Sequence, residues 1–128
     1  MKIAIFWDKI FENNNFRNLE FSKNLSPFNE LARLNGFDDT ISSDLLDLRE
    51  DKDDFIILCF LNLTVSNILQ YIKMFLKYPK NQKYFFAFEP EIIVRLNYNR
   101  IFHSFFEKVY TWNDDLVDNK KYFKYLYP

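Results

Sequence analysis

The sequence predicts an α/β protein, a Rossmann-like three-layer sandwich built on a mainly parallel sheet. Short apolar runs alternate with helical patterns in the order strand, helix, strand, helix, strand, helix, strand. Each apolar run stops abruptly at polar or acidic residues. The chain has 128 residues, the length of one domain, and can bury roughly two thirds of its unfolded surface. We therefore expect a single domain over residues 1–128.

The first strand is predicted at Lys2–Trp7, a short apolar run. The polar stretch from Asp8 to Asn24 is predicted to be a loop, or a loop that leads into an irregular helix. Ser26 and Pro27 then begin a helix, because serine is a good N-cap and proline a good first helical residue. Gly36, the only glycine of the chain, ends this helix.

The acidic segment Phe37–Asp54 has no clear period. It has room for a short strand near Thr40-Ile41 and a helical turn around Ser43–Leu48. The second clear strand is predicted at Phe55–Leu61. It contains Cys59, the only cysteine, which we expect to be a buried small hydrophobe.

The next helix is predicted at Val65–Lys77, with Asn62 or Thr64 as its cap. Five aliphatic residues spaced i, i+3, i+4, i+7 and i+11 define its apolar face, which we expect to face the core. These residues are Val65, Ile68, Leu69, Ile72 and Leu76. The other face carries Ser66, Asn67, Gln70, Lys73 and Lys77.

The second half continues the alternation of strands and helices. A third strand is predicted at Lys83–Phe88 and a fourth at Lys108–Trp112, with helical stretches at Glu91–Leu96 and Arg100–Phe106 between them. His103 lies among large apolar residues and is predicted to be a core or interface histidine.

The C-terminal segment Asn113–Pro128 is mixed, and its Lys120–Tyr127 part interleaves lysines with aromatic residues. Such a pattern can bind single-stranded nucleic acid by stacking and phosphate contacts. It can equally dock its aromatic rings on a core while the lysines face water. We expect docking and no nucleic-acid partner, because the chain as a whole is not basic.

The composition excludes several classes of site. One glycine excludes glycine-rich dinucleotide and phosphate loops, and one histidine with one cysteine excludes a Cys/His zinc site, so no metal is expected. The formal net charge is −1, with 12 acidic and 7 basic residues in 1–64 against 6 and 10 in 65–128. No apolar run has the roughly 18 residues of a membrane span. Without a signal-peptide pattern, a cytoplasmic location is expected.

Ligands of parallel α/β sheets bind beyond the carboxyl ends of the strands. The residues at those ends define a candidate cleft. They are Trp7, Asp8, Asn62, Trp112 and Asn113. Helix caps and loops need the same residue types at these points, so a purely structural role remains open for Asp8, Asn62 and Asn113.

Glu89 directly follows the apolar run of the third strand, and Pro90 stiffens the turn after it. A carboxylate held there among aromatic residues can have a raised pKa and act as a general base. Alternatively, Glu89 or Glu91 stabilises the N-terminus of the following helix.

Four segments, in order, resemble the N-terminal half of family 10 glycosyltransferases, the α-1,3/4-fucosyltransferases and their relatives. These segments are Lys2–Trp7, Asp53–Ile57, Lys83–Glu91 and Phe106–Asp115. The resemblance implies one half of a GT-B architecture and inverting transfer of L-fucose from GDP-fucose to a glycan hydroxyl, as in lipopolysaccharide synthesis, with no required cofactor. It implies that Glu89 is the general base and that this domain faces the acceptor.

The sequence departs from that family in two ways. Pro90 follows Glu89 directly, which leaves Glu91 as a rival base. The donor-binding C-terminal domain is absent, so GDP-fucose is expected to bind mainly through the missing domain, and this domain alone is not expected to turn over. The alternative hypothesis is a stand-alone α/β binding or interaction module without catalysis.

Overall fold

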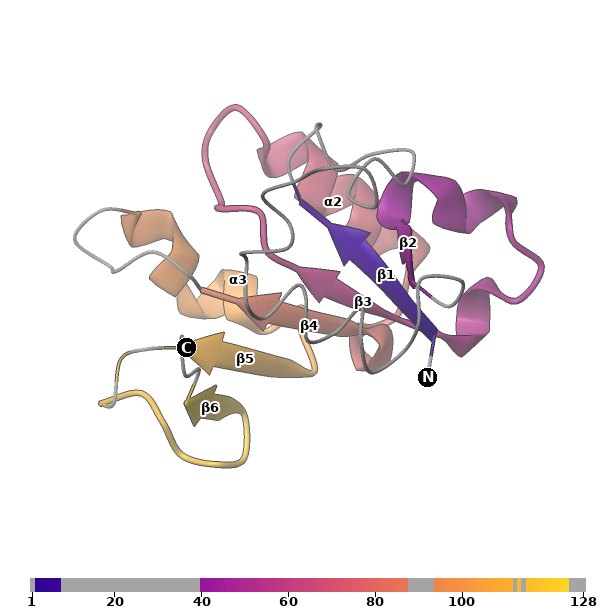
Figure 1. Ribbon diagram of the computed structural model, residues 1–128. Helices are drawn as coiled ribbons and strands as arrows, with labels where there is room; N and C mark the ends of the chain where they lie inside the picture. The colour runs from indigo at the N-terminus through magenta and orange to yellow at the C-terminus, as the bar shows by residue number, and fades with distance from the viewer. Residues whose placement is uncertain (1, 8–39, 88–93, 112, 114, 125–128) are drawn as a thin grey trace, which may run out of the picture. The chain divides into compact units, whose positions relative to one another are not determined.

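A computed structural model describes residues 2–7, 40–87, 94–111, 113 and 115–124. Its strands join in one parallel sheet of order β2-β1-β3-β4-β5-β6, which confirms the predicted α/β, Rossmann-like fold (Figure 1). The chain divides into a first unit, residues 1–58 with 126–128, and a second unit, residues 59–125. The strands are β1 (Lys2–Phe6), β2 (Thr40–Ser42), β3 (Phe55–Cys59), β4 (Lys83–Phe86), β5 (Lys108–Thr111) and β6 (Tyr122–Lys124).

In the first unit β1 pairs with β2 in parallel, with Ala4 opposite Ile41. The three central residues of β1 are buried, as the apolar run predicts. After β2 the chain forms two 3-10 helices, η3 (Ser43–Leu48) and η4 (Lys52–Asp54). The expected short strand and helical turn are both present. Leu46 of η3 is fully buried and anchors this segment.

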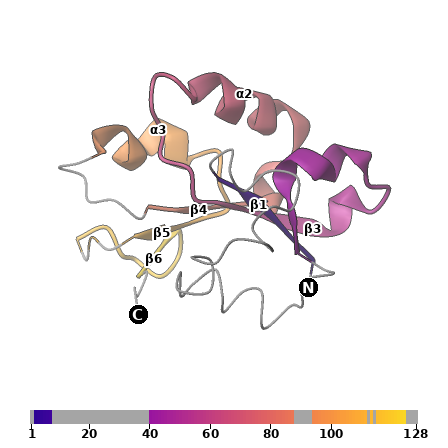
Figure 2. The same ribbon diagram turned by 45° about the horizontal axis from the view of Figure 1, so that its top comes forward.

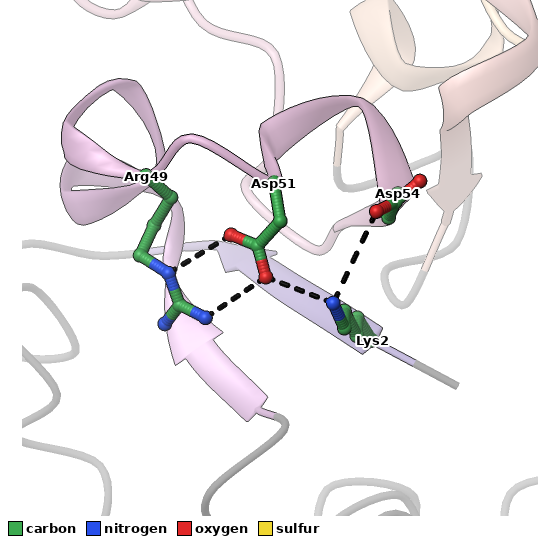
Figure 3. A network of polar contacts seen from close by, with 4 residues as sticks. All are labelled: Lys2, Arg49, Asp51 and Asp54. Atoms are coloured by element: carbon green, nitrogen blue, oxygen red, sulfur yellow. Dashed lines mark hydrogen bonds and ion pairs between the residues drawn. The ribbon is translucent and has the colours of Figure 1, made fainter.

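A charge network ties the start of β1 to the turn before β3 (Figure 3). Lys2 Nζ donates to the Asp51 carboxylate at 2.9 Å, and Arg49 Nε and Nη2 donate to it at 3.0 Å each. Lys2 also lies 4.0 Å from Asp54. The hydrogen bonds from Lys2 and then Arg49 lower the pKa of Asp51 to about 2. The network lies at the amino end of β1, whereas Trp7 follows its carboxyl end.

In the second unit α2 (Ile68–Lys77) and α3 (Arg100–His103) cover one face of β4 and β5 (Figure 2). The core between them is aromatic. The Tyr71 ring meets Phe102 edge-on at 4.9 Å, and Phe102 meets Phe85 of β4 at the same distance. Phe106 packs 5.3 Å from Phe85. Edge-to-face pairs at these distances add to the stability that burial alone supplies.

The opposite face of the same strands carries a ladder of rings. Phe86, Tyr110 and Phe123 are register neighbours on β4, β5 and β6. Phe86 stacks on Tyr110 at 4.6 Å, and Tyr110 lies 5.7 Å from Phe123. Phe60, just after β3, extends the ladder with a centroid 4.8 Å from Phe86. Cross-strand aromatic pairs of this kind stabilise a sheet.

The tail forms β6, a strand that the sequence pattern does not predict. Tyr122 is buried while Lys120 and Lys124 are exposed, so docking is confirmed for the described part of the tail. Lys121 departs from the expectation that the lysines face water, because it is half-buried and its Nζ donates to the Phe106 carbonyl. Asp118 Oδ1 accepts the backbone N–H groups of Lys120, Lys121 and Tyr122, and these bonds lower its pKa to about 2. Asn119 takes the left-handed conformation at φ 59° within this turn, which asparagine tolerates.

The helices differ from their predictions in extent and in the face they bury. The helix expected around Ser26–Gly36 lies outside the described residues. The stretch near Glu91–Leu96 contributes a 3-10 helix, η6 (Arg95–Tyr98), and α3 ends at His103 rather than Phe106.

The predicted core face of α2 is wrong. Its aliphatic residues are exposed, whereas Tyr71 and Met74 are buried. The buried face is the one that carries Tyr71, because the Tyr71 ring packs against Phe85 of β4 and Phe102 of α3.

We expect Asp51→Asn to lower the melting temperature at pH 7 and to have a much smaller effect at pH 2. The folded pKa of Asp51 lies below the ordinary value of about 3.9, so its contribution is present above that value and is lost as pH falls toward 2. Thermal melts of the parent chain and the Asp51→Asn variant from pH 7 to pH 2 measure the difference in melting temperature. Asp53→Asn, at an exposed position in η4, is the control. If the difference in melting temperature is as large at pH 2 as at pH 7, the ionised Asp51 carboxylate is not its source.

Candidate functional site

The structure describes three of the seven predicted site residues. Trp7 follows β1 directly in the first unit, and Asn62 and Asn113 follow β3 and β5 in the second unit; all three are half-buried. The strands are parallel, so each of these residues lies at a carboxyl end, as predicted. The remaining four lie outside the described residues. They are Asp8, Glu89, Glu91 and Trp112.

Asparagine side chains hold the segment between β3 and α2. Asn67 Nδ2 donates to the Asn62 carbonyl at 2.6 Å, and Asn67 Oδ1 accepts the Thr64 N–H at 2.8 Å. Asn97 Oδ1 accepts the Leu63 N–H at 2.6 Å, and Asn97 Nδ2 donates to Asn62 Oδ1 at 2.8 Å. Buried backbone groups outside regular structure need such partners. The bonds give this loop one defined conformation.

Asn97 is fully buried, and His103 holds its backbone. His103 Nε2 lies 2.6 Å from the Asn97 carbonyl, and Nδ1 lies 3.0 Å from the Tyr122 hydroxyl. A carbonyl only accepts, so Nε2 carries the proton and Nδ1 accepts from Tyr122. Burial lowers the pKa of His103, which favours this neutral form. The prediction of a core histidine is confirmed.

Tyr71 connects α2 to the end of β3. Its hydroxyl donates to the Leu61 carbonyl, one residue before Asn62. The ring is fully buried, and burial raises the pKa of Tyr71 well above its ordinary value. Cys59, at the end of β3, is also buried, as predicted, and burial raises the pKa of its thiol. Neither group has the low pKa of an activated nucleophile.

Asn113 forms a local turn after β5. Its Oδ1 accepts the Asp115 N–H at 3.0 Å, and its own N–H donates to Thr111 Oγ1 at 3.1 Å. The oxygens of Asn62 and Asn113 therefore serve the loops, as the structural alternative predicts. Their Nδ2 groups have no hydrogen-bond acceptor among the described residues. These two amide N–H groups can donate to the oxygens of a ligand.

Sequence reasoning missed Asn97, the residue that organises this loop. It lies thirty-five positions after Asn62 and outside the strand ends. Nothing in the spacing around it separates a buried asparagine from an exposed one. Among the described residues no group of three or more His, Cys, Asp or Glu side chains is placed to hold a metal ion.

Comparisons with protein-family models, curated proteins and solved structures found no match to this chain. No helix in the described segments is both long and apolar enough to cross a membrane. The candidate site is thus defined by its location at the carboxyl ends of the strands and by the side-chain amides of Asn62 and Asn113.

Asn97→Ala is expected to lower the free energy of unfolding by about 2 kcal/mol, because it leaves the buried Leu63 N–H without an acceptor. Urea denaturation of both proteins measures this difference. Asn81→Ala, at an exposed position of the 3-10 helix η5 (Lys80–Gln82), is the matched control and should change little. Equal stability of Asn97→Ala and the parent chain would show that the loop does not depend on Asn97.

Proposed function

We propose that the chain is the acceptor-side N-terminal domain of an inverting glycosyltransferase that resembles the GDP-fucose-dependent fucosyltransferases. One observation carries the proposal. Two half-buried amide N–H groups, on Asn62 and Asn113, lie at the carboxyl ends of β3 and β5. These strands flank β4, whose carboxyl end leads to Glu89. Amide donors suit sugar hydroxyl oxygens, which are uncharged and accept hydrogen bonds.

The proposed chemistry places a base on the acceptor side. Glu89 takes the proton of the acceptor hydroxyl. At the same time the oxygen of that hydroxyl forms a bond to C1 of the donor sugar. The bond from C1 to the phosphate oxygen breaks, and GDP leaves from the opposite side, which inverts C1. Arg or Lys groups that stabilise the leaving diphosphate belong, in this proposal, to the donor-binding domain.

The first test is glycan binding by the 128-residue chain. We expect a hit on a glycan array and, in NMR titrations with that glycan, shifts of the Asn62 and Asn113 side-chain amides. Asn62→Asp with Asn113→Asp keeps both oxygens and removes both donors, so affinity should fall at least about fivefold. Asn81→Asp is the control, because Asn81 is exposed in η5. Unchanged affinity in the double variant removes these amides from the site.

The second test concerns the base. In a complete enzyme containing this domain, Glu89→Gln should reduce transfer from GDP-fucose about 100-fold or more while GDP binding stays unchanged. Glu91→Gln is the matched comparison, with near-normal transfer expected. If Glu91→Gln abolishes transfer and Glu89→Gln does not, the base is Glu91. If neither changes transfer, the domain binds without taking part in catalysis.

A further inference from the structure

An apolar surface on the second unit is turned toward solvent. Leu69 and Leu76 of α2 are 67% and 84% exposed, and Ile68 and Ile72 beside them are partly exposed. At about 100° per residue, these four side chains occupy about 100° of the helix circumference. The buried residues Tyr71 and Met74 lie on another side of the helix. The helix α2 therefore has two apolar faces, of which the sheet and α3 bury only one.

The exposed face of α2 continues onto the α3 segment. Phe75 lies next to Ile68 on the helix circumference, and its ring stacks on Phe105 at 4.5 Å with an interplanar angle of 8°. Phe105 remains partly exposed, and Ile101, four residues earlier, is 74% exposed. We call this surface the α2–α3 ridge. Its members are Ile68, Leu69, Ile72, Leu76, Ile101 and Phe105.

The charges beside the ridge are mainly positive. The chain has no aspartate or glutamate from residue 55 to residue 88, and its charged residues there are all lysines. Lys73 borders Leu69 on the circumference of α2 and is exposed. Arg100 begins α3 with its guanidinium 5.2 Å from the Tyr122 ring centre. Among the described residues of this unit, Glu107 is the first acid that follows α3, and it interacts with Lys121.

We propose that the α2–α3 ridge docks this domain onto the surface of an anionic lipid bilayer. Aliphatic side chains on one side of a helix, with lysines at the border, fit the boundary between acyl chains and headgroups. The lysine stems lie along the apolar layer while their amines reach lipid phosphates. With ten residues, α2 is about 15 Å long, which suits a helix lying in the membrane plane.

A second copy of the chain is the competing occupant, and the charges disfavour it. Pairing two ridges through α2 would bring the lysines of both copies to one interface without an acid on either helix. Like charges placed together in this way oppose association. An anionic membrane instead supplies the missing negative charge. This proposal is independent of the glycosyltransferase proposal, because it uses different side chains.

Vesicle co-sedimentation tests the proposal directly. The 128-residue chain should bind vesicles of phosphatidylcholine with one third phosphatidylglycerol, bind pure phosphatidylcholine much more weakly, and dissociate as salt rises. Leu69→Gln with Leu76→Gln should lower the partition coefficient at least about tenfold. Lys73→Gln should lower it about fivefold.

Two matched controls separate the ridge from general effects. Leu48→Gln removes an apolar side chain that is 81% exposed on η3 in the first unit, and Lys120→Gln removes an exposed charge before β6. Neither should reduce binding as the ridge variants do. All replaced side chains are exposed, so far-ultraviolet circular dichroism and melting temperature should match the parent chain.

Two results would overturn membrane docking. The first is that the parent chain does not bind anionic vesicles, or that it binds them no more tightly than the double leucine variant does. The other is a dimer in sedimentation equilibrium that becomes monomeric in the double leucine variant, which would assign the ridge to a second copy. Glycan binding can fail or succeed without affecting either result.

Discussion

The buried side chain of Tyr71 fixes the arrangement of the second unit. A tyrosine can be buried at low cost only when its ring is packed and its hydroxyl has a partner. Both conditions are met here, by the rings of Phe85, Phe102 and Phe106 and by the Leu61 carbonyl. Together, the ring contacts and the hydrogen bond of Tyr71 set how α2 is rotated on the sheet. It also sets where the chain runs as it leaves β3 for Asn62.

The rotation of α2 has consequences on both sides of the helix. Inward, Met74 is brought to the end of β3, where its sulfur lies 3.8 Å from Cys59 Sγ. Outward, Leu69 and Leu76 are left in contact with water. The exposed apolar ridge therefore follows from the burial of a tyrosine. A helix that turned its aliphatic face inward would lose the Tyr71 hydrogen bond and its edge-on ring contacts.

The loop after β3 depends on residues from much later in the chain. Asn97 holds Leu63 and Asn62, and His103 holds the Asn97 carbonyl. Tyr122 of β6 completes the series by donating to His103. The tail is thus joined to the candidate site through three hydrogen-bonded side chains. The Asp118 turn lies directly before β6 and leads the chain into its parallel pairing with β5.

Local patterns predict β1, β3, β4 and β5 well, because each of these strands lies in an apolar run that ends at polar residues. They also place Asn62 and Asn113 correctly at strand ends. They fail for α2, because counting aliphatic spacing overlooks Tyr71 and Met74, which form the second face. They miss β6, because Tyr122-Phe123-Lys124 stands among lysines and gains its role only by pairing with β5. They miss Asn97, because its partners are distant in sequence.

The two candidate surfaces are separable because different side chains support them. Asn97 holds the loop after β3 and takes no part in the ridge, since it is fully buried. Leu69 and Leu76 form the ridge and bury little in the core, so the fold does not need them. Tyr71 belongs to both, because it fixes the loop through Leu61 and the ridge through the rotation of α2. Replacing Tyr71 would therefore disturb both surfaces together, whereas the exposed leucines and the amides at the strand ends can be changed one surface at a time.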